Sequence, residues 1–415
     1  MCTLSSLARQ CEEKALLFLS VSLILAALTP VRTADAEEKP DVSPKIACSA
    51  LNGKTIEGVQ VTSAAEVAAT ASVAGYCRVD GTKIGTQLDI EVRLPEGWQR
   101  RLVQEGGGGF DGFIMPIGKE DVALNLHAVQ VVTNGGHRDP TGKDFLNDPA
   151  KIQLYAHSSI GEGLKFAKAV IAKYYGSQPS YSYFEGCSNG GRGALNAADK
   201  YGAEFDAVIA GAPSRNVPGQ IEQWTRAAQL TLPSPTKLGA VYAAEVAKCD
   251  DLDGVKDGII SNWMACTFDP AVDVPQSVGL TASEAASVKT LMADLQLSDG
   301  STIYSGYLFG NMAQWGPAYA GLGIGHMKYI VLSDQDWDPR TFTADKYYSG
   351  MSQLIDGTYG FDASVSGLAH FLESGKKIVV WQGSDDTLLS LKDTIRTWEP
   401  VAKAAGDAAR RNSRT

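Results

Sequence analysis

The sequence predicts an α/β fold in which a largely parallel sheet is interrupted by one large insertion. Short apolar runs alternate with stretches of helical spacing, and glycine repeatedly follows the apolar runs. The alternation stops near residue 214, gives way to an irregular stretch rich in Gly, Asp, Tyr and Trp, and resumes near residue 371. With 415 residues, 44% of them hydrophobic and 20% charged, the chain is long enough for a large core.

Each expected strand is a short apolar or alternating run. The expected strands are 86–93, 101–104, 128–133, 181–184, 207–210 and 377–381. Two helices, 161–175 and 190–201, are expected between them. Alternating strands and helices of this kind predict helices on both faces of the sheet. In the first helix, the spacing places one set of apolar residues on a shared buried face: Leu164, Phe166, Ala167, Val170 and Ile171.

The charge balance excludes two classes of partner. The chain has 37 basic and 47 acidic residues, a net charge of −10, and contains no long basic block. Binding to nucleic acid or to an anionic membrane surface depends on clustered positive charge, so neither is expected.

The N-terminus resembles an export signal. Residues 15–28 form an apolar run that follows Arg9 and Lys14, and an A-x-A cleavage pattern stands at 34–36. The run is too short to span a bilayer comfortably, so residues 1–36 are expected to be a signal peptide, with a retained anchor as the alternative. The mature protein would then be secreted or periplasmic, where disulfides are allowed.

Five cysteines remain after that leader. Cys48 and Cys77 flank the first mature segment, and Cys249 and Cys266 bracket an acidic segment. Each of these two pairs is expected to form a disulfide. Cys187 is then left over, which implies either an unpaired thiol or a missing partner.

The strongest motif lies at residues 186–190, which read GCSNG. A G-x-S-x-G pattern between a strand and a helix is typical of a nucleophile elbow, in which flanking glycines permit a sharp turn that exposes the serine hydroxyl. The strand-like YSYF precedes the motif and a helical stretch follows it. These residues predict that Ser188 is a nucleophile, and the alternative is a structural turn serine.

A glycine run upstream provides candidate donors for an oxyanion hole. Acyl transfer requires backbone N–H groups aimed at the tetrahedral oxyanion, and glycine lets the main chain approach the scissile carbonyl. The expected donors come from the loop residues Gly107, Gly108 and Gly109, and from Asn189 directly after the nucleophile. A flexible turn, or a phosphate loop without its lysine, is the alternative.

An acidic residue follows the last expected strand. Residues 379–386 read VVWQGSDD, which puts Asp385 or Asp386 where a carboxylate can orient a histidine in the chain order Ser, Asp, His. A loop-capping aspartate is the alternative.

Four aspartates lie within residues 250–257. Such a cluster is either solvated or bound to a hard cation, and Ca²⁺ takes oxygen ligands from loops of this kind. The segment is not an EF-hand, because the sixth and twelfth positions counted from Asp251 hold Lys256 and Asn262.

At these motifs the chain resembles the tannase and feruloyl esterase family of α/β-hydrolases, which also includes mono(2-hydroxyethyl) terephthalate hydrolases. The resemblance covers about residues 45–400. The matching stretches are VQEGGGGFDG, TNGGHRDP, YFEGCSNGGRGAL, FDAVIAGAPS, CDDLDGVKDGII with CTFDP, and DQDWDPRTF.

The resemblance implies a role for several residues. Ser188 matches the nucleophile and Asp386 the triad acid, while Cys187 matches a cysteine that bridges to one beside the catalytic histidine. A structural Ca²⁺ would be held by the side chains of Asp250, Asp253 and Asp257 and by the carbonyls of Val255 and Ile259.

One feature departs from the family pattern. The family's histidine follows the acid in a His-Cys pair, whereas none of the chain's histidines follows Asp386 and no cysteine follows Cys266. The basic tail at 410–415 matches no core element. A truncated or frameshifted copy explains these departures, and such a chain is expected to be a poor catalyst. The five histidines are His127, His137, His157, His326 and His370.

The expected fold is therefore an α/β-hydrolase core sheet with a large lid insertion between the nucleophile and the acid. The resemblance implies an exported serine carboxylic-ester hydrolase that cleaves esters of aromatic acids through an acyl-enzyme. The alternative is a non-catalytic remnant that binds aromatic ligands. The expected divisions are a signal peptide at 1–36, a first core part at 37–214, a lid with the calcium loop at 215–370, and a second core part at 371–415.

Overall fold

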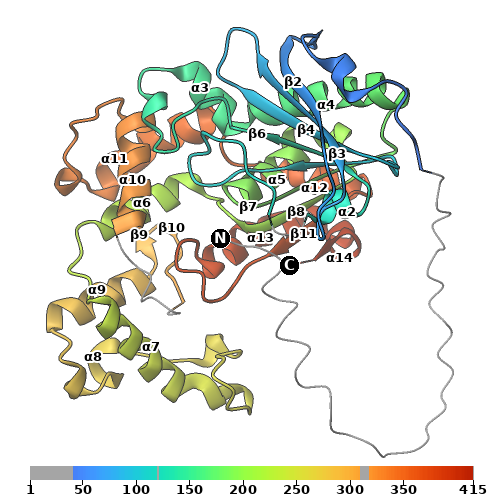
Figure 1. Cartoon of the computed structure of the whole chain (residues 1–415). Helices are drawn as coiled ribbons and strands as arrows, with labels where there is room; N and C mark the ends of the chain where they lie inside the picture. The colour runs from blue at the N-terminus through green and yellow to red at the C-terminus, as the bar shows by residue number, and fades with distance from the viewer. Residues whose placement is uncertain (1–40, 119–120, 309–316, 415) are drawn as a thin grey trace, which may run out of the picture.

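The computed structural model describes residues 41–118, 121–308 and 317–414, so the expected signal peptide lies outside the described residues. Its centre is a ten-stranded sheet (Figure 1). The first four strand pairs are antiparallel, and every pair from β6 onward is parallel. In spatial order the strands are β1 (Thr55–Ile56), β2 (Val59–Val67), β3 (Tyr76–Lys83), β4 (Asp89–Pro95), β6 (Val129–Thr133), β5 (Arg101–Glu105), β7 (Tyr181–Ser188), β8 (Ala207–Pro213), β11 (Lys377–Trp381) and β12 (Ser413–Arg414).

The strand order positions the functional motifs. Because β5 pairs directly with β7, the glycine loop after β5 emerges beside the turn after β7. The acidic segment after β11 emerges from the same edge, two strands away. Ligands of open α/β sheets bind at this carboxyl edge of the parallel strands.

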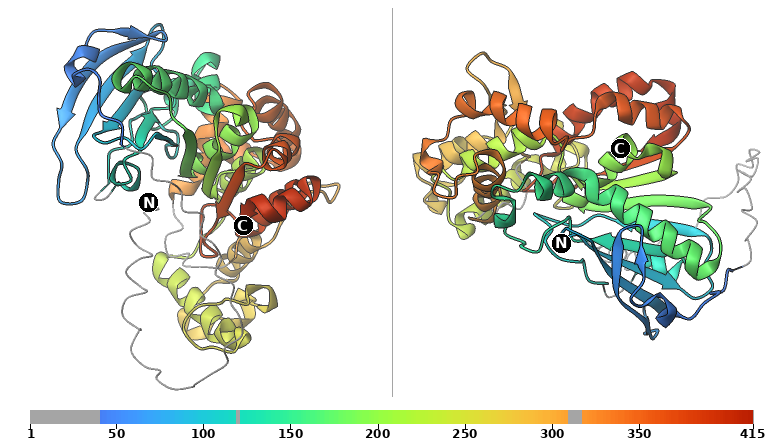
Figure 2. Two further views of the ribbon diagram at one scale, coloured as in Figure 1. Left: turned by 90° about the vertical axis from the view of Figure 1, so that its right-hand side faces the viewer. Right: turned by 90° about the horizontal axis from the view of Figure 1, so that it is seen from above.

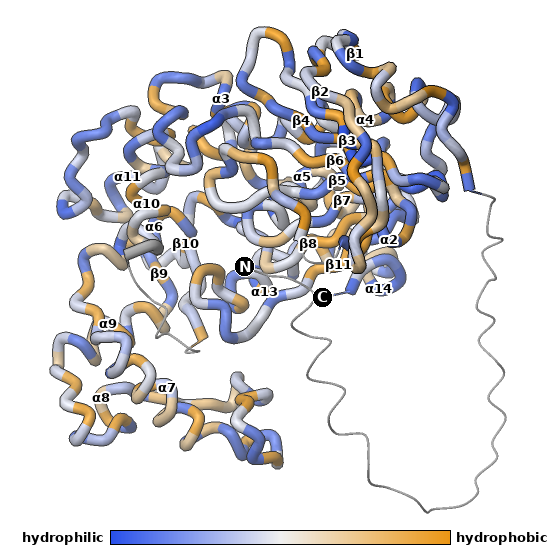
Figure 3. The backbone as a smooth tube through the Cα atoms, in the orientation of Figure 1, coloured by the Kyte–Doolittle hydropathy of each residue, from blue (hydrophilic) through white to orange (hydrophobic). Residues whose placement is uncertain are grey.

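The main helices of the core cover one face of the parallel strands. In α4 (Ser159–Tyr175), all five residues expected on a shared face are buried, which confirms that prediction. Helix α5 (Asn189–Lys200) packs on β7 and β8, and α12 (Val365–Glu373) packs on α5. Much of the chain in the central strands is coloured as hydrophobic in Figure 3. The remaining core helices are α2 (Val122–Asn125), α3 (Pro149–Gln153), α13 (Leu391–Ala405) and α14 (Asp407–Asn412).

The opposite face of β8 and β11 is open in the part of the chain that the structure describes. Ile209, Val379 and Trp381 alternate with the buried residues of these strands and are 42%, 36% and 38% exposed. The expectation of helices on both faces is therefore wrong for this end of the sheet. Strand periodicity shows that both faces carry apolar side chains, but it does not show which face a helix covers.

The chain between β8 and β11 forms the inserted segment. Its helices α7, α8 and α9 lie away from the sheet, as both views show (Figures 1 and 2). Since α12 already packs on the core helix α5, the lid boundary expected at residue 370 falls inside α12. The inserted elements are α6 (Val217–Ala227), α7 (Pro235–Cys249), α8 (Pro270–Asp273), α9 (Ala282–Met292), β9 (Leu295–Gln296), β10 (Thr302–Tyr304), α10 (Pro317–His326) and α11 (Ala344–Ser352).

The basic tail is part of the core. Residues 407–412 form α14, and Ser413 and Arg414 pair in parallel with Ile378 and Val379 of β11. The expectation that this tail matches no core element is wrong, because pairing with a distant strand is a long-range interaction that a six-residue pattern does not reveal. None of the described helices is both long and apolar enough to cross a bilayer.

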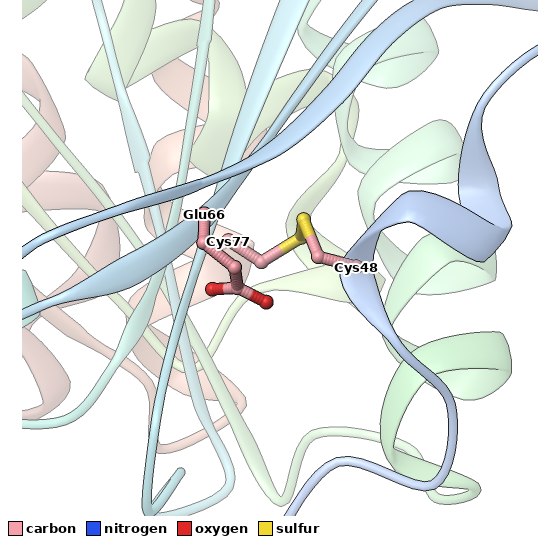
Figure 4. A group of neighbouring side chains, drawn as sticks. All are labelled: Cys48, Glu66 and Cys77. Atoms are coloured by element: carbon pink, nitrogen blue, oxygen red, sulfur yellow. A yellow bond between two sulfur atoms is a disulfide. The ribbon is translucent and has the colours of Figure 1, made fainter.

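Both expected disulfides are present. Cys48 bonds to Cys77 at the start of the sheet, and Cys249 bonds to Cys266 in the lid. Cys187 takes part in neither bond. Figure 4 shows Glu66 beside the first disulfide, but both sulfurs there are used in the covalent bond, so this group is not a metal site.

Three glycines let the loop after β5, the end of β7 and the start of α5 touch through their backbones. A Cβ atom on Gly186 would lie 2.6 Å from the carbonyl carbon of Gly190, and one on Gly106 would lie 2.5 Å from its Cα. A Cβ on Gly190 would lie 2.8 Å from the carbonyl oxygens of Gly106 and Gly107. Real Cβ atoms do not approach backbone this closely, so side chains are excluded from this contact.

We expect Gly190→Ala to separate the glycine loop from α5 and to destabilise the fold by about 1–3 kcal/mol, as overpacking of backbone does. Gly239→Ala on α7 is the matched control, because its Cβ meets nothing within 4 Å and alanine favours a helix. Urea unfolding of both variants measures the effect. Equal stability of Gly190→Ala and the parent chain would contradict this account of the contact.

Candidate active site

Ser188 lies at the junction of β7 and α5. Its backbone has φ 62° and ψ −121°, a region that residues other than glycine rarely adopt. The Ser214 N–H donates to the Ser188 carbonyl at 3.0 Å and ties the turn to the end of β8. This strained strand-to-helix turn is the geometry of a nucleophile elbow.

Ser188 lines a small cavity of about 30 Å³ at the carboxyl edge of the sheet. Asn189 and Gly109, two of the expected oxyanion-hole residues, also line it. A cavity of this volume holds at least one water-sized group, such as a reacting carbonyl oxygen.

The other two expected donors lie in the same loop but do not line this cavity. A Cβ on Gly107 would lie 2.1 Å from the Asp111 carboxylate, so Gly107 is in contact with that side chain, while Gly108 has open space around it. Of the four residues expected to form the oxyanion hole, the structure thus brings Gly109 and Asn189 to the Ser188 cavity.

The lid supplies the opposite wall of the cavity. Gln220 and Trp224 line it from α6, and Leu322 and His326 line it from α10, so each helix contributes an i, i+4 pair. Gly323 allows this close approach of the two helices, because a Cβ there would lie 2.6 Å from the Thr225 nitrogen on α6.

His326 offers an acceptor nitrogen at this wall. Its Nδ1 lies 2.9 Å from the Leu322 carbonyl oxygen, which can only accept, so Nδ1 carries the proton and Nε2 is the acceptor. Burial lowers the pKa of His326 to about 4, which keeps the ring neutral at physiological pH. The ring packs on Phe110 with centroids 4.5 Å apart.

Gln220 offers the complementary group, a donor. Its Oε1 accepts a hydrogen bond from the Ser214 hydroxyl at 2.9 Å, whereas its buried Nε2 has no hydrogen-bond partner within the described part of the chain. Sequence reasoning missed Gln220 and His326, because both lie in the irregular inserted stretch. The i, i+4 spacing within 220–224 and 322–326 is the signal that could have revealed them.

A buried network lies beneath the elbow. The guanidinium of Arg192 donates to Asn189 Oδ1 from Nε at 3.0 Å and from Nη2 at 2.6 Å, and Asn189 Nδ2 donates to Asp111 Oδ2 at 3.1 Å. Burial raises the pKa of Asp111 to about 7, an effect that Arg192 opposes. Neither Asp111 nor Arg192 was singled out from the sequence, although Arg192 follows Asn189 by three residues on α5.

Asp386, the expected triad acid, lies after β11 and binds its own turn. Its Oδ1 accepts from the backbone N–H of Leu388 at 2.8 Å and of Leu389 at 3.0 Å, and its Oδ2 accepts from Gln382 Nε2 at 2.9 Å. Burial raises the pKa of this carboxyl above its ordinary value. Leu388 and Leu389 line the Ser188 cavity, so Asp386 shapes that wall through its turn.

The neighbouring Asp385 faces a second, larger cavity of about 420 Å³. Glu245 of α7 and Lys392 of α13 also line this cavity, with apolar walls from the disulfide-closed loop of the lid. Burial and the nearby Asp385 raise the pKa of Glu245 to about 8.

The expected calcium loop is exposed and closed by the Cys249–Cys266 disulfide. Asp250 accepts from the backbone N–H of Gly258 at 3.0 Å, Asp253 from Val255 at 2.9 Å, and Asp257 from Ile259 at 3.0 Å. In the described part of the chain, these carboxylates do not form a group whose oxygens all lie within 4.8 Å of one another. The donor set consists of hard oxygens, as Ca²⁺ requires, but the side chains do not converge in this structure.

The chain is similar to known proteins in sequence and in fold. Residues 71–330 match the tannase and feruloyl esterase family. Feruloyl esterase B of Aspergillus niger is 27% identical over 381 residues, which cover 86% of this chain and 71% of that protein. A probable feruloyl esterase B-1 of Aspergillus terreus is 28% identical over 359 residues, covering 81% and 67%. The chain thus spans about two thirds of the length of these relatives.

Solved structures show the same fold. Feruloyl esterase B from Aspergillus oryzae has a TM-score of 0.78 at 22% identity, covering 89% of this chain and 82% of that one. Tannin acyl hydrolase from Aspergillus niger has a TM-score of 0.70 at 20% identity, covering 88% and 80%. These likenesses confirm the predicted α/β-hydrolase fold.

The family match covers more than half of the chain and includes both the glycine loop and the elbow. By sequence and by fold, the chain belongs to the tannase and feruloyl esterase family of carboxylic ester hydrolases.

Proposed function

We propose that this protein is a serine esterase that cleaves esters of aromatic acids through an acyl-enzyme on Ser188. The observation that carries the proposal is the strained backbone of Ser188, which places the serine at a cavity shared with Asn189 and Gly109. The names of the relatives, feruloyl esterase and tannin acyl hydrolase, support an aromatic acyl group. Family membership favours this activity over a non-catalytic remnant.

The proposed reaction has two steps. Ser188 Oγ attacks the ester carbonyl carbon, an imidazole takes the hydroxyl proton, and the alcohol leaves with a proton as the acyl-enzyme forms. Water then attacks the acyl carbon and releases the acid. Backbone N–H groups at Asn189 and in the glycine loop stabilise the oxyanion in both steps.

Ser188→Ala is expected to abolish hydrolysis of methyl ferulate and methyl gallate, with a fall in kcat of at least about 10³-fold, as removal of a serine nucleophile causes. Ser182→Ala, earlier on the same strand β7, is the matched control and should retain the parent rate. Release of the free acid, followed by chromatography, measures both. Equal rates for Ser188→Ala and the parent would exclude Ser188 as the nucleophile.

We further propose that His326 takes part in the reaction as a proton acceptor, because its Nε2 is an acceptor on a residue that lines the same cavity as Ser188. His326→Gln is expected to lower kcat/KM for both esters by about 10-fold or more, as loss of a buried hydrogen-bond partner does. The contribution of His326 to kcat/KM should persist above about pH 5 and vanish as the pH falls through 4, because the imidazole is neutral only above its lowered pKa of about 4.

His370→Gln is the control for this prediction, since His370 is exposed on the core helix α12. A pH–rate profile between 3.5 and 8 compares the two variants with the parent. If His326→Gln kept the parent kcat/KM throughout that range, His326 would have no part in the reaction.

Export to the periplasm or the medium is also proposed. The N-terminal sequence has the pattern of a signal peptide, and the two disulfides form and persist in oxidising compartments.

We propose, finally, that the loop at 250–259 binds a structural Ca²⁺ through Asp250, Asp253, Asp257 and the carbonyls of Val255 and Ile259. The three carboxylates share one exposed loop, and their mutual repulsion favours a divalent cation. The ion would order the lid and take no part in the chemistry.

Calcium is expected to raise the melting temperature. At a hundredfold excess over Kd, ligand linkage stabilises the fold by about 2.7 kcal/mol. Thermal melts with Ca²⁺ and with a chelator measure the effect, and the double variant Asp250→Asn with Asp253→Asn should abolish it. Identical midpoints for the parent chain in both buffers would refute the site.

A further inference from the structure

A chain of three buried polar side chains runs from Arg192 through Asn189 to Asp111, beneath the nucleophile elbow. We propose that Asp111 is a positioning residue, which holds Asn189 and the glycine loop so that their backbone N–H groups face the same point beside Ser188. The proposal rests on the proposed esterase function and adds to it the residues that shape its oxyanion hole.

Arg192 is the fixed end of this chain. Its guanidinium donates to the backbone carbonyls of Tyr155 at 3.0 Å and Ala156 at 2.5 Å, both in the π-helical turn Leu154–Ser158, and to that of Phe361 at 3.3 Å. The rings of Tyr155 and Phe361 lie 5.0 Å from its central carbon. A planar cation with these contacts cannot turn, so the two N–H groups that reach Asn189 have fixed directions.

The direction of the Asn189 amide follows from chemistry. Arginine only donates, so the amide atom that faces Arg192 is the oxygen and the amide nitrogen faces Asp111. The side chain of Asn189 is therefore held at both ends. Because Asn189 is the first residue of α5 and directly follows the nucleophile, this restraint also fixes its backbone N–H.

The Asp111 side chain connects Asn189 to the glycine loop. Its carboxylate is in contact with Gly107 and Gly135, where a Cβ would lie 2.1 Å and 2.6 Å from its oxygens. Its backbone N–H donates to the Gly108 carbonyl at 2.9 Å, and the Gly112 N–H donates to the Asn134 carbonyl at 2.9 Å. One side chain thus contacts the loop after β5, the turn after β6 and the residue after Ser188.

The contacts of Asp111 are unusual for a structural carboxylate. The residue is 8% exposed, and among the described residues its carboxylate forms no ion pair and its Oδ1 has no hydrogen-bond partner. Arg192 reaches it only through Asn189. Burying a carboxylate with incomplete hydrogen bonding destabilises the fold. Costs of this kind are typical of residues that shape a functional site.

The test compares two substitutions at residue 111. Asp111→Asn keeps the shape and an acceptor oxygen for Asn189 Nδ2, whereas Asp111→Ala removes both. We expect kcat of Asp111→Ala to fall about 10²-fold or more with KM within about threefold, the pattern of a lost transition-state interaction. Asp111→Asn should recover kcat to within about fivefold of the parent. Rates are expressed per active serine, counted by fluorophosphonate titration.

A second measurement separates positioning from folding. Phenylboronic acid forms a tetrahedral adduct on an active-site serine, whereas benzoate resembles the ground state of the product acid. Asp111→Ala should weaken boronate binding about 10-fold or more and leave benzoate binding unchanged, both by calorimetry. If Asp111→Ala does not fold, Asn189→Ala removes the same link and should show the same pattern.

Two results would overturn the proposal. One is a kcat for Asp111→Ala within threefold of the parent; the other is an Asp111→Asn variant as impaired as Asp111→Ala. A parent chain that hydrolyses neither ester would refute the proposed function alone, because the boronate comparison still tests the positioning of the oxyanion hole.

Discussion

The close backbone contact among Gly106, Gly186 and Gly190 is the constraint on which the site depends. It brings the end of β5, the end of β7 and the first turn of α5 closer together than any side chain permits. The elbow and the glycine loop are consequently parts of one rigid unit. The strain in the Ser188 backbone is tolerated because α5 and the sheet hold both sides of the turn.

The polar groups beneath the elbow are linked in series. Asn189 lies between Arg192 and Asp111 and hydrogen-bonds to both. Backbone carbonyls and aromatic rings then complete the environment of the cation. The Asn189 amide between Arg192 and Asp111 fixes two directions at once, because its oxygen only accepts and its nitrogen only donates.

Local patterns predicted the core because they report local physics. The elbow follows from glycine spacing, the buried face of α4 from helical periodicity, and the two disulfides from cysteine positions along the chain. The features that the sequence left hidden depend on long-range contacts. Ser413 pairs with β11, and His326 packs on Phe110 beside the glycine loop, so both contacts join segments far apart in sequence. The exposure of Ile209 depends likewise on which distant segments cover the sheet.

The site therefore divides into two parts with different physical origins. The core wall, from Gly109 to Asn189, adjoins the backbone contact among Gly106, Gly186 and Gly190. The lid wall consists of α6 and α10, which contact each other at Gly323. Gln220 on α6 offers a donor that has no partner among the described residues, and His326 on α10 offers an acceptor. An ester that reaches Ser188 in the proposed reaction meets side chains of both walls. Substrate choice and proton transfer in that reaction would then depend on the lid helices as well as on the sheet edge.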